Sequence, residues 1–89
     1  MQPQSDDNNK LETMGDRIRA TRLARGLTVT DAARSVDVSR TQFHQWENGT
    51  AEHPRLRPLI AYAKLVDVSL DWLVNHQGPK PKGLRRPNP

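Results

Sequence analysis

The stretch TVTDAARSVDVSRTQFHQWENG, residues 28–49 of this 89-residue chain, decides the predicted fold. It holds two helix starts of one design. Thr28 is followed three positions later by Asp31, and Ser39 is followed three positions later by Gln42. At that spacing the two side chains can bond each other's backbone and satisfy the free N–H groups of a first helical turn. The stretch therefore predicts two helices that begin directly after Thr28 and Ser39.

Only three residues separate these two predicted helices, which run over residues 29–36 and 40–48. So short a connection makes one helix cross the other steeply, in the arrangement called a helix-turn-helix. In that motif the second helix protrudes and fits the major groove of duplex DNA. The Asn48-Gly49 pair is the expected stop of the second helix, because glycine adopts the left-handed conformation that ends many helices.

The second predicted helix carries hydrogen-bonding side chains on its outer face. On a helical wheel, Phe43, Trp46 and Glu47 fall on the side toward the protein body. Exposed helix faces usually carry Glu–Lys pairs four residues apart, whereas Arg and Gln can bond guanine and adenine through paired hydrogen bonds. The face therefore predicts base recognition in a DNA groove, with an ordinary solvated surface as the alternative. Its residues are Arg40, Thr41, Gln42, His44, Gln45 and Asn48.

Three further helices complete a predicted all-α fold, a compact five-helix bundle. Their apolar patterns place them at residues 15–25, 58–66 and 70–75. Ser69 provides a third hydroxyl cap, and no alternating β-branched run indicates a strand. The apolar side chains expected to face inward from the first two of these helices are Ile18, Leu23, Leu59, Ile60, Ala63 and Leu65.

The two ends of the chain are polar and are expected to bury nothing. Residues 1–13 carry a net negative charge, and residues 77–89 are basic and rich in Pro and Gly, so both are predicted to be flexible, disordered tails. The single folded domain is then expected at residues 14–76, with the helix-turn-helix core at about 28–48. The basic tail has three interpretations: a solubilising appendage, an arm that follows DNA, or a segment that binds a partner protein.

The charge balance favours a nucleic-acid partner. The net charge is +4, and arginine supplies most of the fourteen basic side chains. Arginine's planar fork of donors suits phosphates and base edges better than the lysine ammonium does. Basic side chains that neutralise phosphates give salt-dependent affinity for DNA of any sequence.

Several functional classes are excluded by what the chain has and lacks. It contains no cysteine, and its histidines, His44, His53 and His76, are scattered without carboxylates at metal-ligand spacing. Asp67 and Asp71 flank a helix start, where acidic groups favour the helix dipole. No nucleophile elbow, phosphate loop, signal peptide or membrane-length apolar run occurs. We therefore expect no enzyme, cofactor, metal, membrane contact or small-molecule ligand, and a cytoplasmic protein.

Three stretches in order carry a resemblance to a known family: RIRATRLARGLT, DAARSVDVSRTQFHQWENG and HPRLRPLIAYAKLVDVSLDWLV. Residues 15–74 resemble the Cro/C1-type helix-turn-helix domain, the lambda-repressor-like DNA-binding fold of phage repressors and many bacterial regulators. The Pro-Arg-x-x-Pro spacing and the VSLDWL ending resemble the lambdoid phage repressors especially.

The resemblance implies roles for individual residues, position by position. The residues that match its base-contacting face are Arg40, Thr41, Gln42, His44 and Gln45. Those that match contacts with the DNA backbone, the last of them near the minor groove, are Thr28, Ser39, Asn48 and Arg55. Arg22 and Glu47 match an ion pair that ties the first helix to the recognition helix. Trp72 and Leu73 match the dimer interface, and for Trp72 a place in the core is the alternative.

The chain also departs from the family pattern at the DNA side. Val29 stands where relatives carry a Gln that contacts a phosphate or supports the recognition helix. Asp37 stands where the turn usually has Gly with positive φ, a conformation that Asp tolerates at some cost. Glu52 and His53 stand where relatives often carry basic residues. We therefore expect weaker backbone affinity, which the basic tail would compensate.

These observations predict a sequence-specific transcriptional regulator that binds double-stranded DNA. The resemblance implies a repressor that binds a partly palindromic operator as a homodimer, encoded by a prokaryote or a phage. The first alternative is an antitoxin-like or phage regulatory protein that acts mainly through a protein partner. The second alternative is a nonspecific nucleic-acid binder.

Overall fold

The computed structural model describes residues 11–84; residues 1–10 and 85–89, the outer parts of the two predicted tails, lie outside the described residues. Within the described range the chain forms five helices and no strand, so the all-α prediction is confirmed. The helices are α1 (Met14–Ala24), α2 (Val29–Ser35), α3 (Arg40–Asn48), α4 (Leu56–Val66) and α5 (Leu70–Asn75).

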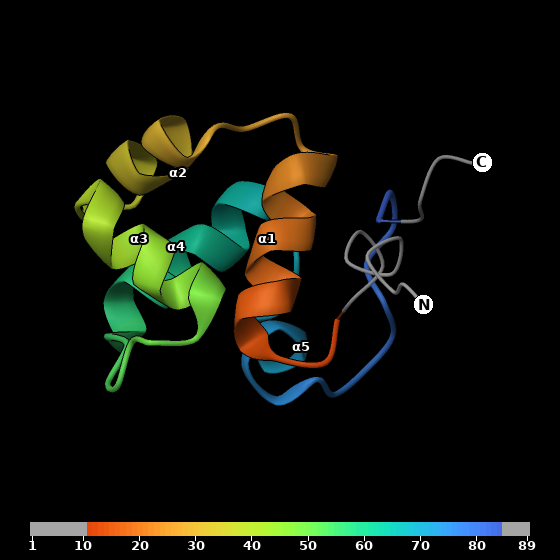
Figure 1. The fold of residues 1–89 in the computed structure, drawn as a ribbon. Coiled ribbons are helices and arrows are strands. Elements are labelled where there is room, and N and C mark those ends of the chain that lie inside the picture. Colours follow the sequence, from red (N-terminus) through yellow and green to blue (C-terminus); the bar gives the residue numbers. More distant parts are fainter. Residues whose placement is uncertain (1–10, 85–89) are drawn as a thin grey trace, which may run out of the picture.

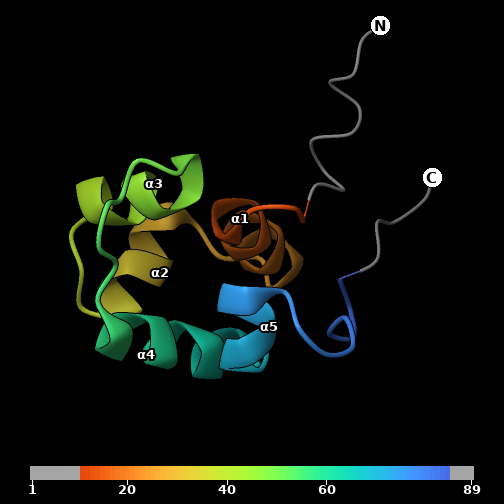
Figure 2. The same ribbon diagram turned by 90° about the horizontal axis from the view of Figure 1, so that it is seen from below.

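The five helices form two layers around one core. Figure 2 shows α1 and α3 on one side and α4 and α5 on the other, with α2 joining the layers at one end. Helix α1 packs against both α3 and α5, and α2 packs against both α3 and α4. Both ends of the described chain lie on the side of α1 and α5, away from α2 (Figure 1). The largest fully buried side chains are Trp72, Tyr62, Phe43, Ile18, Leu73, Val66 and Thr21.

Four of the five helices begin at a hydroxyl cap. The predicted caps all accept a hydrogen bond from the backbone N–H three residues on, and Thr13 caps α1 in the same way. Thr13 was expected in the flexible tail, although Asp16 follows it three residues later, at the spacing that predicted the cap at Thr28. The four capping residues are Thr13, Thr28, Ser39 and Ser69.

Helix α4 begins two residues earlier than predicted, at Leu56, and its N-cap residue Arg55 makes no side-chain cap hydrogen bond. Pro58 fits inside the first turn, where its missing N–H would have no helical partner. The predicted inward position of Leu65 is wrong, since its side chain is 39% exposed. The buried stripe of α4 consists of Leu59, Tyr62, Ala63 and Val66.

Helix α1 buries polar side chains where apolar ones were expected. Leu23, predicted to face inward, is 47% exposed, so that prediction is wrong. The buried side chains beside Ile18 are Arg17, Thr21 and Arg22. These four residues share one helical face, which leaves Leu23 one position outside it.

The described parts of the predicted tails contact the body of the protein, which corrects the expectation that they bury nothing. Leu11 and Leu84 are partly buried against the core. Arg25 donates from Nε to the carbonyl of Val66 (2.9 Å) and from its terminal nitrogens to the carbonyl of Lys82 (3.4 Å). Residues 77–84 therefore fold back along α1. Among the described helices, none has the length and apolar character needed to cross a membrane.

Candidate nucleic-acid interface

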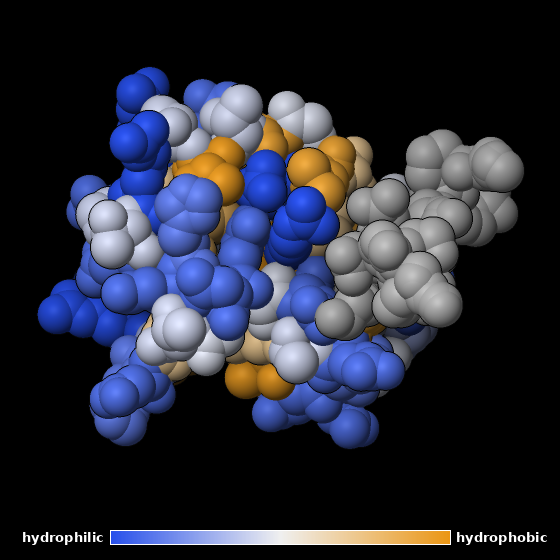
Figure 3. Space-filling view, viewed as in Figure 1, coloured by the Kyte–Doolittle hydropathy of each residue, from blue (hydrophilic) through white to orange (hydrophobic). Residues whose placement is uncertain are grey.

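Helix α3 separates a buried aromatic face from an exposed polar face. Phe43 and Trp46 are buried, with ring centroids 5.3 Å apart, and Phe43 also lies 5.6 Å from Tyr62. The surface over α3 is largely hydrophilic (Figure 3). The exposed side chains include every residue predicted to contact bases: Arg40, Thr41, Gln42, His44 and Gln45.

The cap of α3 occupies part of the Gln42 side chain. Ser39 Oγ accepts from the Gln42 N–H at 3.0 Å, and Gln42 Oε1 accepts from the Ser39 N–H at 3.1 Å. This capping box confirms the predicted start of α3. The amide NH₂ of Gln42 is a donor that the cap does not use, so this side chain can still donate toward a base edge.

Two of the predicted backbone-contacting residues, Thr28 and Asn48, keep donors available in the same way. Thr28 Oγ1 accepts from the Asp31 N–H (3.0 Å), and Asn48 Oδ1 accepts from the Thr50 hydroxyl (2.7 Å) and N–H (3.2 Å). These bonds use only acceptor lone pairs, and they leave the hydroxyl hydrogen of Thr28 and the NH₂ of Asn48 free to donate. Phosphate oxygens accept hydrogen bonds, so donors are what a backbone contact requires.

A hollow of about 210 Å³ joins the recognition helix to the segment that follows it. Gln42 and Gln45 of α3 line it together with Arg55, the residue before α4. Glu52 and His53, which the sequence analysis identified as departures from the family pattern, also line it. The fold thus brings Arg55 next to Gln42 and Gln45. Of the other predicted backbone contacts, Ser39 and Asn48 lie at the two ends of α3 and Thr28 caps α2.

Asp37, in the turn between α2 and α3, adopts the positive φ that its position in the turn implied. Asp37 has a φ of 63°, in the left-handed region. Its N–H donates to the Arg34 carbonyl (3.2 Å), and the N–H of Val38 donates to the Ala33 carbonyl (3.0 Å). Asp is among the few non-glycine residues that adopt this conformation readily. The tight turn therefore forms without a glycine at this position.

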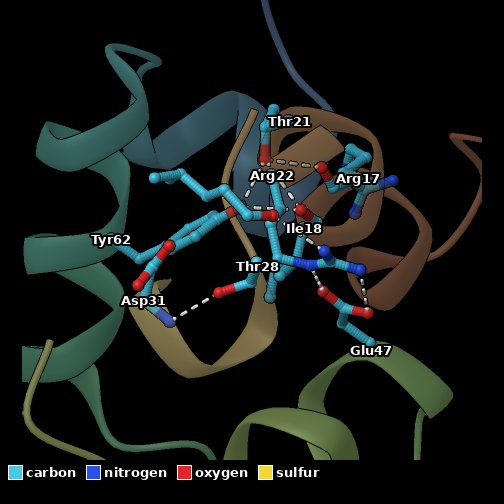
Figure 4. A network of polar contacts seen from close by, with 9 residues as sticks. Arg17, Ile18, Thr21, Arg22, Thr28, Asp31, Glu47 and Tyr62 are labelled. Carbon is cyan, nitrogen blue, oxygen red and sulfur yellow. Dashed lines mark hydrogen bonds and ion pairs between the residues drawn. The ribbon is translucent and has the colours of Figure 1, made fainter. Parts of the chain in front are cut away.

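Arg22 holds α3 against α1 (Figure 4). Its Nε donates to Glu47 Oε2 at 2.6 Å and Nη2 donates to Oε1 at 3.3 Å, while Nη1 donates to the Leu27 carbonyl at 2.9 Å. The two side chains are only 10% and 9% exposed. The residues of the predicted ion pair therefore do meet, and Arg22 also fixes the loop that leads to α2.

Arg17 is a structural residue that sequence reasoning did not identify. Its guanidinium donates to the carbonyls of Leu73 (2.8 Å) and Val74 (3.3 Å) in the last turn of α5 and to those of Leu11 (2.7 Å) and Glu12 (3.1 Å). Burial lowers the pKa of Arg17 from its ordinary value, but arginine stays protonated in proteins. Arg17 thus joins α1, α5 and the incoming chain through backbone groups.

A second group that was not predicted links α1 to α4. The hydroxyl of Tyr62 donates to the Ile18 carbonyl at 2.6 Å and lies 2.8 Å from Thr21 Oγ1 (Figure 4). Burial raises the pKa of Tyr62 above its ordinary value. The sequence did contain a signal that the Tyr62 side chain is buried. Tyr62 lies three residues after Leu59 and one turn before Val66, at the spacing of the apolar face of a helix.

The predicted dimer residues occupy the core of the single chain. Trp72 is 2% exposed and Leu73 is fully buried. Within this fold their side chains present almost no surface to a second copy. Trp72 is therefore a core residue, and a dimer contact at this end of the molecule stays a prediction.

Comparison with known proteins assigns the fold to a family. Residues 13–74 match the helix-turn-helix domain family. Comparison with curated proteins gives no significant match. The crystal structure of the P22 c2 repressor with a synthetic operator is 31% identical, with a TM-score of 0.69, over 75% of this chain and 100% of that one.

Two further solved structures are similar. The solution structure of the DNA-binding domain of the P22 c2 repressor is 31% identical, with a TM-score of 0.63, over 72% of this chain and 83% of that one. The complex of the SinR and SinI proteins, 22% identical with a TM-score of 0.66 over 71% of this chain and 61% of that one, shows the fold alone. The family match and the 31% identity together show that the chain belongs to the Cro/C1-type helix-turn-helix family of DNA-binding regulators.

Proposed function

We propose that this protein is a transcriptional repressor that binds a partly palindromic operator as a homodimer. One observation carries the proposal: six exposed polar side chains of α3 project from a helix whose other face is held against the body by buried aromatics and an ion pair. A helix held in this way can present donors and acceptors to base edges at a fixed geometry. The proposed base contacts are Arg40, Thr41, Gln42, His44 and Gln45.

Contacts with the sugar-phosphate backbone set the register of the helix in the groove. For this role we propose Thr28 and Ser39 at the starts of α2 and α3, Asn48 at the end of α3, and Arg55 at the start of α4. The first three are uncharged donors, so they orient the protein more than they attract it. Long-range attraction then comes from arginine side chains such as Arg40 and Arg55, and it weakens as salt is added.

The proposed homodimer rests on the expected symmetry of the operator and not on a contact within the single chain. Two-fold symmetry in an operator mirrors two-fold symmetry in the protein, with half-sites about one helical turn apart. Because Trp72 and Leu73 are buried, the contact requires exposed apolar side chains near them or near the DNA side. The described residues include four large exposed apolar side chains: Leu23, Leu56, Leu65 and Val74. For the contact we propose Leu56, 61% exposed beside Arg55, and Val74, 36% exposed at the end of α5. The protein would act in the cytoplasm, on bacterial or phage DNA.

The experiment that tests this proposal is selection of bound duplexes from a random DNA pool, near physiological salt. We expect enrichment of a two-fold symmetric motif whose half-sites lie about 10 base pairs apart. Enrichment of an unsymmetric single half-site would contradict the homodimer and leave base recognition intact. Binding without enrichment, lost as salt is raised, would instead identify a nonspecific nucleic-acid binder.

A further inference from the structure

Gly15, the second residue of α1, lies directly against the last turn of the recognition helix. A Cβ atom at this position would stand 2.4 Å from the carbonyl oxygen of Glu47 and 2.6 Å from that of Trp46. Both neighbours are backbone atoms, so no change of rotamer could relieve the overlap. The close approach of α1 to α3 therefore depends on the missing side chain of Gly15.

The α1 side of this contact is held in place. Thr13 caps α1 through a capping box with Asp16, in which the two residues exchange hydrogen bonds of 3.0 and 3.3 Å. Arg17, two residues after Gly15 and 4% exposed, bonds the carbonyls of Leu11 and Leu73 at 2.7 and 2.8 Å. The first turn of α1 is thus tied to the incoming chain and to α5, and it cannot yield without breaking these bonds.

The α3 side is held by different groups. Glu47 supplies the carbonyl oxygen nearest to Gly15. Its side-chain carboxylate accepts hydrogen bonds from Arg22 of α1. Phe43 and Trp46 anchor the buried face of α3 in the core. Because both backbones are held in this way, a Cβ at residue 15 could be accommodated only by displacing α3 relative to α1, at the expense of these contacts.

We propose that Gly15 is a positioning residue for DNA recognition: its contact with the carbonyls of Trp46 and Glu47 sets the tilt of α3 and so the placement of Arg40 and Gln45 at base edges. This inference rests on the proposed base recognition by α3. A nine-residue helix is a rigid rod of about 13 Å, so a shift at one end moves the side chains along its length. Hydrogen bonds weaken steeply once distances and angles leave a narrow range.

The test compares Gly15→Ala with a matched glycine control, Gly78→Ala. Gly78 lies after α5 with a φ of 92°, and no atom lies within 4 Å of the place that a Cβ would take, so alanine there strains the backbone without touching α3. Affinity is measured for the selected operator and for an unrelated duplex. For Gly15→Ala we expect operator affinity to fall by about tenfold or more, the effect of losing one paired base contact, with little change on the unrelated duplex. Gly78→Ala should leave the ratio of the two affinities unchanged.

The amide NMR spectrum provides a second readout that lost stability alone would not move. Gly15→Ala should shift resonances along α3, from Arg40 to Asn48, in protein that remains folded. Alanine favours a helix interior over glycine, so helix propensity by itself predicts no loss for α1. If the variant is unfolded alone, an osmolyte that strengthens burial restores the fold, and both proteins are compared in that solution.

Each outcome separates the positioning role of Gly15 from the proposed function. Unchanged operator affinity in Gly15→Ala, or a parallel loss on both duplexes, would overturn the positioning role while operator recognition by the wild type still stands. No preference of the wild type for any duplex would overturn both the proposed function and the inference that rests on it. A lower operator-to-unrelated ratio together with shifted α3 resonances supports the role of Gly15.

Discussion

Helices α1 and α4 each contain eleven residues, yet they are held in the fold by opposite kinds of contact. Helix α4 buries a stripe of Leu59, Tyr62, Ala63 and Val66, and its outer side is exposed. Helix α1 buries the polar side chains of Arg17, Thr21 and Arg22 around a single large apolar residue, Ile18. Apolar burial has no direction, whereas hydrogen bonds require particular distances and angles.

The difference assigns separate tasks to the two helices. Helix α4 supplies stability, because removing its side chains from water favours any compact arrangement. Helix α1 specifies orientation, because Arg17 and Arg22 each bond groups on other parts of the chain and would lose those bonds if the parts rotated. Loss of α1 contacts should therefore change DNA recognition as well as stability, and loss of α4 contacts should change stability alone.

Arg22→Met is the strongest test of the α1 task. The change leaves the Glu47 carboxylate, 9% exposed, without its cation and should lower the free energy of unfolding by about 4 kcal/mol. Urea unfolding followed by far-UV circular dichroism measures the loss. Operator affinity of the remaining folded protein should also fall. The double variant Arg22→Met/Glu47→Leu removes the stranded charge and should recover much of the stability; a further loss in the double variant would contradict this account of the pair.

Leu59→Ala tests the α4 task. Leu59 is 5% exposed, and truncating it leaves a cavity that should cost about 3 kcal/mol of unfolding free energy. The matched control is Leu65→Ala on the same helix, where the side chain is 39% exposed and the expected loss is under about 1 kcal/mol. Titration of the operator under conditions where both variants are folded should give wild-type affinity. A selective loss of operator preference in Leu59→Ala would break the division of tasks.

Tyr62→Phe tests the bond that joins the two helices and has the smallest expected effect. Removing the hydroxyl leaves the Ile18 carbonyl without this donor, at a cost of about 1.5 kcal/mol near neutral pH. Burial holds the pKa of Tyr62 above its ordinary value, so the unfolded tyrosine ionises first as the pH rises past about 10. The contribution of this group is thus complete below about pH 10 and is lost progressively above it.

The chain has one tyrosine, so the difference between wild type and Tyr62→Phe isolates this titration. Unfolding free energies of both proteins, measured from about pH 8 to about pH 11 on either side of the ordinary tyrosine pKa, should converge as the pH increases. A difference that stays constant or widens over this range would show that the hydroxyl is not protected from ionisation by the fold.

Local signals in the sequence predicted most of the fold. Hydroxyl caps placed the starts of α2, α3 and α5 at the correct residues, because a cap and its partner are three residues apart and need no tertiary information. The stop at Gly49, with a φ of 80°, was predicted for the same reason. The exposed face of α3 followed from helical periodicity, which also predicted that Phe43 and Trp46 are buried.

Long-range contacts explain what the sequence did not predict. The partners of Arg17 include the carbonyl of Leu73, 56 residues away, and no local pattern distinguishes such an arginine from a solvated one. Gly15 lies in the first turn of a helix, where its sequence neighbours give no reason for a glycine. Only the close approach of α3 shows why a side chain is excluded there. Leu23 was predicted to face inward because apolar periodicity cannot recognise a buried face built from polar residues.

Recognition of base identity by the exposed side chains of α3, held in place by α1, is tested most directly at Arg40. The measurement repeats the selection from a random DNA pool with Arg40→Ala beside the wild type. We predict that the variant loses preference at one position in each half-site, by about 1–3 kcal/mol, and keeps it elsewhere. A variant that enriches the wild-type motif unchanged, or loses affinity equally for all sequences, would contradict base recognition by Arg40 at the start of α3.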